Sequence, residues 1–196
     1  MPSPVTFHST SASTTHDVAS SRNSAAPDVA PATRVLGLGN DILGDDAVGL
    51  VIARRLGDHP DLPASVEIRE HDGGCLSLLD ELTGADHVLL VDAISTGAKP
   101  GTPYLLRPDD LPSVVGALPH GLGLRDSLEL GDALGLPMPR SLRILAIEIA
   151  DAHRLREGLG PELLDALPDL IRLAFDLVKG HEPETGLGVI PDAASS

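Results

Sequence analysis

The fold of this chain is set by the stretch RVLGLGNDILGDDAVG, residues 34–49. Its apolar run Val35–Leu38 predicts a buried strand, and the glycines that follow predict a turn. A helix is then expected over about Asp45–Leu56, with the adjacent carboxylates of Asp45 and Asp46 in its first turn. Negative charge is favoured there by the helix dipole and by unpaired backbone N–H groups. Helix capping alone would explain this pair, so its chemistry depends on the rest of the chain.

Composition excludes several classes of function. The chain has 196 residues, 14 basic against 29 acidic, and a formal net charge of -15. Nucleic acids and anionic membrane surfaces demand clustered basic residues, so proteins, cations or metals are the expected partners. The single cysteine, Cys75, excludes an internal disulfide and a cysteine-based zinc cluster. This cysteine usage fits a reducing compartment and predicts a cytoplasmic protein.

The two ends of the chain differ from its middle. Residues 1–33 are rich in Ser, Thr, Ala and Pro and predict a disordered N-terminal tail without a secretory signal. Residues 34–180 form the expected α/β domain, and residues 181–196 are expected to be a flexible C-terminal tail. No apolar run approaches the ~20 residues needed to span a bilayer, so no membrane insertion is expected.

Hydrophobic periodicity predicts the remaining elements of the domain. Strands are expected at about 65–70, 87–94, 101–107 and 141–149, and helices at about 76–82, 124–134 and 161–178. The resulting order is β α β α β β α β α. It predicts a single-domain three-layer α/β/α sandwich with a mostly parallel, roughly five-stranded sheet. One antiparallel strand is expected where two strands follow each other directly.

Several polar residues fall where such a sheet binds ligands, beyond the carboxyl ends of its strands. Asp46 and Asp72 follow predicted strands, Asp92 lies near the end of the apolar run 87–94, and His120 lies in a glycine-rich loop. A divalent cation held by Asp46, Asp92 and His120 would neutralise carboxylates that otherwise repel. Three protein ligands leave positions free for water or substrate. The structural alternative is that these are capping and buried polar residues.

Other chemistries have weaker support. Gly37 and Gly39 match the first two glycines of a dinucleotide fingerprint, but Ile42 replaces the third, and the acidic pair would repel a pyrophosphate. The phosphate-loop motif and the G-x-S-x-G motif of serine hydrolases are absent from the sequence. Cys75 follows two glycines, so a thiol nucleophile with His120 as its base is a further alternative. The structural alternative for Cys75 is a small buried apolar residue.

An ordered set of motifs between Arg34 and Lys179 resembles the hydrogenase maturation endopeptidases. No single motif is specific for this family, but the order of the motifs and the intervals between them are. The matching residues are Gly37-Leu-Gly-Asn40, Asp45-Asp46, Gly49, Asp72-Gly73-Gly74, Val91-Asp92-Ala93, Pro119-His120, Gly123-Leu124, Leu128, Ile147-Glu148 and Gly158-Leu159.

The resemblance implies an endopeptidase that removes the C-terminal extension of a nickel-iron hydrogenase large-subunit precursor after nickel insertion. Asp46, Asp92 and His120 occupy the positions of the family's metal-binding residues, and Asp72 that of a further acidic residue linked to function. The catalytic set is therefore Asp46, Asp72, Asp92 and His120. Some family members have Glu at the position of Asp46, whose shorter side chain reaches less far. Asp45 is assigned to opening the helix.

The same resemblance implies that nickel arrives with the precursor and that cleavage depends on it. Another divalent metal also fits oxygen and imidazole ligands. The metal could polarise the scissile carbonyl or activate a water, and Asp72 could orient a ligand or act as general base. The alternative function is a non-catalytic metal-binding or chaperone-like module for a metalloenzyme precursor.

Overall fold

The computed structural model describes residues 33–72, 75–111, 118–150, 155–181, 183 and 186–190. The predicted N-terminal tail, residues 1–33, lies outside the described residues except for Thr33. Among the described residues, no helix is long and apolar enough to cross a membrane.

A five-stranded sheet forms the centre of the domain. It consists of β1 (Thr33–Leu38), β2 (Val66–His71), β3 (His87–Ile94), β4 (Pro103–Leu106) and β5 (Ser141–Glu148). The strand order is β2-β1-β3-β5-β4, and β4 alone pairs antiparallel to its neighbour. The predicted mostly parallel sheet is confirmed, as is the antiparallel strand where β4 follows β3 directly.

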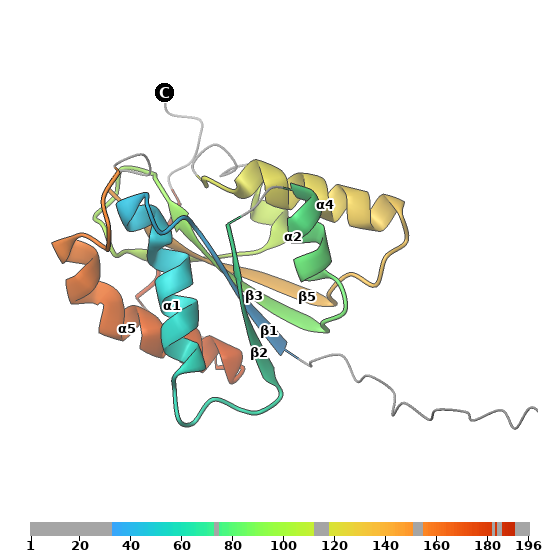
Figure 1. Ribbon diagram of the computed structural model, residues 1–196, viewed down its shortest axis with the longest axis horizontal. Helices are drawn as coiled ribbons and strands as arrows, with labels where there is room; N and C mark the ends of the chain where they lie inside the picture. The colour runs from blue at the N-terminus through green and yellow to red at the C-terminus, as the bar shows by residue number, and fades with distance from the viewer. Residues whose placement is uncertain are drawn as a thin grey trace, which may run out of the picture.

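Helices cover both faces of this sheet. The short 3-10 helix η1 (Gly44–Ala47) leads into α1 (Val48–Gly57), and α5 (Pro161–Val178) lies on the same face. The opposite face carries α2 (Cys75–Leu82) and α4 (Gly121–Ala133), as Figure 1 shows. A second 3-10 helix, η2 (Pro108–Asp110), follows β4. The three-layer α/β/α prediction is confirmed.

Alternation along the strands divides the core into two clusters. In β3, Val88, Leu90 and Ile94 belong to the cluster beneath α2 and α4, whereas Leu89 and Val91 belong to the cluster beneath α1 and α5. Successive side chains of a strand point to opposite faces. Asp92 therefore lies on the α2/α4 face of the sheet.

The carboxyl ends of β1 and β3 form the switch point of the sheet. The chain runs from β1 to β2 on one side and from β3 to β4 and β5 on the other, so the connections after β1 and β3 leave in opposite directions. Ligands of open α/β sheets bind in the crevice that such a reversal creates. Gly37 pairs with Val91, so the next residues, Leu38 and Asp92, lie side by side at this crevice.

Part of the predicted C-terminal tail contacts the domain. The backbone N–H of Gly188 donates a hydrogen bond of 2.7 Å to the carbonyl of Pro103 in β4. Ile190 packs against the core cluster beneath α2 and α4. Residues 188 and 190 therefore contact the domain, although they lie beyond its predicted limit at residue 180.

Candidate functional site

Glycines bring the segment that carries Asp46 down onto the ends of the strands. Gly39 has a φ of +147°, and a Cβ there would collide with the backbone carbonyl of Asp46. Gly37 and Gly49 face each other so closely that a Cβ on either would collide with backbone atoms. Only glycine permits these approaches. Sequence reasoning placed Gly37 in the strand and Gly39 in the turn, and it missed this packing because the partner atoms belong to another element.

Asp46 and Asp92 are both buried at the switch point. Asp46 is 2% exposed and Asp92 is 1% exposed. The Asp92 carboxylate accepts a hydrogen bond of 2.8 Å from the backbone N–H of Ala93. Burial raises the pKa of Asp92 to about 7, and the charge of His120 opposes that rise. The nearby Asp46 carboxylate raises this pKa further. Two carboxylates thus share a site that is shielded from solvent, and His120 supplies positive charge beside them.

His120 reaches the same site from a loop that adjoins neither β1 nor β3 in the sequence. It is the residue before α4, and its carbonyl accepts a hydrogen bond of 3.1 Å from the N–H of Leu124. Its Nε2 lies 3.9 Å from Oδ2 of Asp46, beyond hydrogen-bond range but within ion-pair range. The Asp46 carboxylate raises the pKa of His120 above its usual value, and the charge of Asp92 adds to this effect. The structure therefore brings Asp46, Asp92 and His120 together.

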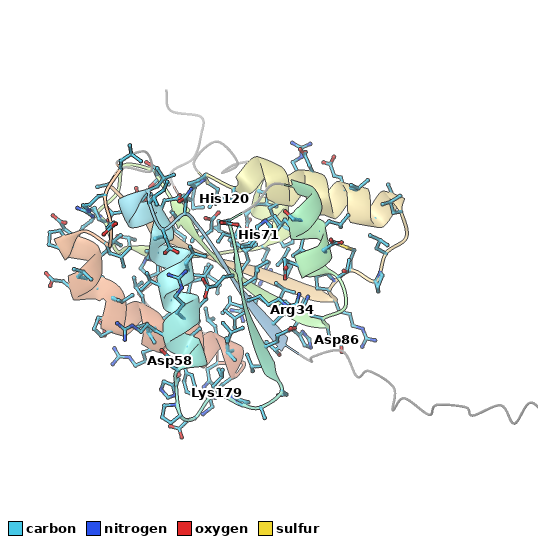
Figure 2. The ribbon with its side chains drawn as sticks, viewed as in Figure 1. Arg34, Asp58, His71, Asp86, His120 and Lys179 are labelled. Carbon is cyan, nitrogen blue, oxygen red and sulfur yellow. The ribbon has the colours of Figure 1, made fainter. Side chains whose placement is uncertain are left out.

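Three buried polar atoms in the described part of the chain lack a hydrogen-bond partner. They are Oδ1 of Asp46, Nε2 of His120 and Nε2 of His71. A buried polar group without a partner costs about 1–3 kcal/mol, so such groups are rare and need an explanation. Figure 2 shows His71 and His120 toward the same end of the domain, away from Arg34 and Asp86. The unpaired atoms thus gather at the carboxyl end of the sheet.

The donor set at this site suits a divalent metal. Carboxylate oxygen and imidazole nitrogen bind Ni²⁺, Zn²⁺ and Mn²⁺, so the residue types leave the metal's identity open. Within the described ranges, no three side chains of His, Cys, Asp or Glu converge closely enough to hold a metal ion. Oδ1 of Asp46 and Nε2 of His120 nevertheless have no hydrogen-bond partner in the described part of the chain.

Asp72 occupies a different position from Asp46, Asp92 and His120. It is exposed and lines an open cavity of about 390 Å³, together with His71 and residues of the loop after β1. The cavity wall also includes Leu50, one helical turn beyond Asp46. Cys75 begins α2, but its side chain lies outside the described part, so the thiol alternative is untested by the geometry.

Asp45 does not cap the helix that it precedes, contrary to the sequence prediction. The N-terminus of η1 has no side-chain cap. Instead, Oδ1 of Asp45 accepts hydrogen bonds from Nη2 of Arg156 at 2.8 Å and from the N–H of Gly160 at 2.6 Å. Gly160 is the residue before α5. Asp45 therefore joins η1 to the start of α5, a link between residues far apart in sequence that local pattern could not predict.

Glu148 is a buried acidic residue with a structural role. It is 0% exposed at the end of β5. Its carboxylate accepts hydrogen bonds from the backbone N–H groups of Thr96, Gly97 and Ala98 and from the Thr96 hydroxyl. These bonds hold the loop that follows β3, the strand that carries Asp92. Glu148 thus supports the site without lining it.

Comparison with known proteins gives consistent matches. The family model HycI, described as hydrogenase maturation protease, matches residues 51–177. The hydrogenase 2 maturation protease of Escherichia coli K12 is 32% identical over 163 residues, which cover 82% of this chain and 96% of that protein. The hydrogenase expression/formation protein HupD of Rhodobacter capsulatus is 32% identical over 145 residues, covering 70% of this chain and 69% of HupD.

Solved structures agree with these matches. The hydrogenase-maturating endopeptidase HybD from Escherichia coli is 31% identical to this chain, with a TM-score of 0.62. The superposition covers 76% of this chain and 93% of HybD.

Proposed function

This chain belongs to the hydrogenase maturation protease family, and from that premise we propose that it removes the C-terminal extension of a nickel-iron hydrogenase large-subunit precursor in the cytoplasm. The observation that carries the proposal is the pair of buried, unpaired carboxylate and imidazole atoms at the carboxyl ends of β1 and β3, which are of the types that can ligate a metal. Asp46 and His120 each have a buried atom without a partner in the described part of the chain. Asp92, beside them, is 1% exposed.

Nickel is proposed to be part of the substrate. The metal already seated in the precursor contacts Asp46, Asp92 and His120, so cleavage follows only after nickel insertion. Electrostatics supports this arrangement, because Asp46 raises the pKa of Asp92 and a bound cation would relieve that repulsion. The chemistry that such a metal supplies is polarisation of a carbonyl or activation of a water. Asp72, exposed on the wall of the neighbouring cavity, orients the peptide or accepts a proton.

Processing of matched precursors tests the dependence on nickel. Nickel-loaded and nickel-free precursor are incubated with the protein, and loss of the extension is followed by mass spectrometry. We expect cleavage of the nickel-loaded form alone. Equal cleavage of both forms would refute recognition of the metal. Tight binding of the loaded precursor without any cleavage would instead support the non-catalytic module.

Single substitutions test the residue assignments. Asp46→Ala, Asp92→Ala and His120→Ala should each abolish processing while the circular dichroism spectrum is retained. Asp58→Ala is the matched control, because Asp58 is exposed beyond the other end of α1 (Figure 2). Cys75→Ala should process normally, and loss of activity there would support a thiol nucleophile. Full activity in any variant of the trio removes that residue from the site.

A further inference from the structure

The imidazole of His71 has the same unusual property as two of the proposed site residues. It ends β2 and is 7% exposed, and its Nε2 is buried without a hydrogen-bond partner. Within the described part of the chain, the only other buried side-chain atoms of this kind are Oδ1 of Asp46 and Nε2 of His120. The proposed processing mechanism uses Asp46 and His120 but leaves His71 unexplained.

Strand register places His71 in line with the site. His71 pairs with Leu38 on β1, and Leu38 lies beside Asp92 on β3, so the three residues form one row across the sheet. Residues paired in this way share a face, and Leu38 packs beneath α2 and α4. Neighbouring strands lie about 4.8 Å apart, so about 10 Å separates the backbones at His71 and Asp92. About three residues of extended peptide span that distance.

The surroundings of His71 leave room for such a peptide. The open cavity of about 390 Å³ adjoins His71 and Asp72 at the end of β2. β2 is the edge strand of the sheet, so the cavity is reached from outside the domain. The cavity is also lined by Leu50 and Arg54 of α1, so a peptide that places nickel at Asp46, Asp92 and His120 has space to continue past the end of β2.

An apolar residue would satisfy the packing at this position without leaving a polar atom unpaired. The paired residue in the same row, Leu38, is apolar and fully buried. An imidazole there loses its hydrogen bond to water on folding and regains none within the described structure. Buried polar groups left without partners are a mark of functional sites. A ligand that supplies the missing partner explains the residue.

We propose that His71 is a substrate-binding residue whose Nε2 forms a hydrogen bond with the backbone of the precursor peptide next to the nickel. This inference rests on the proposed function. A peptide group offers both a donor and an acceptor, and a neutral imidazole nitrogen can pair with either one. His71 thus anchors the peptide one row away from the metal-binding residues, which aligns the segment to be cut.

Kinetics and stability measured on the same variants test this role. His71→Leu keeps a similar apolar volume but removes the polar atom, and His71→Gln keeps an amide that can donate and accept. His87→Leu is the matched control, because His87 is exposed at the opposite, amino end of β3. The measurements are KM and kcat for nickel-loaded precursor and Tm of each free protein.

We expect His71→Leu to raise KM about 10-fold, the effect of losing one hydrogen bond, while kcat changes less than about 2-fold. Its Tm should equal or exceed that of the wild type, because the unpaired atom is gone. His71→Gln should recover most of the KM, and His87→Leu should change neither constant. A purely structural histidine would produce the reverse pattern, a lower Tm with an unchanged KM.

The outcomes separate the two proposals. If the wild type does not cut nickel-loaded precursor, the proposed function fails. If the wild type cuts and His71→Leu keeps its KM, melts below the wild type or does not fold, the role of His71 is overturned and the proposed function stands.

Discussion

Replacing Asp92 by Asn should stabilise the protein at alkaline pH while it abolishes processing. Burial raises the pKa of Asp92 from 3.8 to about 7. The unfolded chain therefore releases this proton near pH 4, whereas the folded protein keeps it until about pH 7. Because the folded state binds more protons across this window, its stability falls as pH rises from 4 to 7 and then levels off.

The size of this effect follows from the two pKa values. They lie about three pH units apart, and each unit corresponds to 1.36 kcal/mol, so the ionised Asp92 costs the fold about 4 kcal/mol at pH 8. The pKa of about 7 already includes the attraction of His120, which lowers it, so this cost is the net cost of ionising Asp92 in the fold. Asn does not ionise, and it retains an oxygen to accept the N–H of Ala93. We expect a net gain of up to about 4 kcal/mol at pH 8 and almost none at pH 4.

Urea unfolding at pH 4, 6 and 8 measures the free energies of unfolding of wild type and Asp92→Asn. Asp58→Asn serves as the exposed control and should change stability little at any pH. The reasoning is refuted if Asp92→Asn is less stable than the wild type at pH 8, or if the difference between the two proteins is the same at all three pH values. Loss of activity with a gain in stability is the trade-off expected of a functional group.

The remaining predictions concern the support of the site and its charge. Glu148→Gln should cost about 1–3 kcal/mol in urea unfolding. The three backbone N–H groups that now bind Oε1 would bind a neutral amide oxygen in place of a carboxylate, and the amide N–H₂ would face the Thr96 hydroxyl that now donates to Oε2. Gly49→Ala should lower stability by about 1–3 kcal/mol and reduce kcat, since a Cβ would collide with backbone carbonyls of β1 and β3. In an NMR titration, His120 should show a pKa above 6.5 that falls toward this value in Asp46→Asn; an unchanged pKa would contradict their electrostatic contact.

Local sequence pattern determined the elements and the layers of this protein. A short continuous apolar run is typical of a strand buried on both faces, as in a parallel sheet, so residues 87–94 predicted β3 with its observed limits. Pro161 and the apolar face after it predicted α5 in the same way. Asp46 and Asp92 were predictable as neighbours because a fold of this kind places the ends of its strands at one edge. His120 follows no strand and was added through the metal hypothesis and the resemblance of its motif to the family.

Only the tertiary structure decided which polar residues near that edge remain unpaired. Asp45 precedes a helix, and its pattern predicted a cap, yet its partners Arg156 and Gly160 come from the far end of the chain. The strand predicted over about 65–70 ended before His71, and only the register of β2 with β1 placed this residue in a row with Asp92. Sequence patterns report which face of an element is apolar, because that depends on neighbours along the chain. The partners of a polar atom depend on elements that meet only after folding.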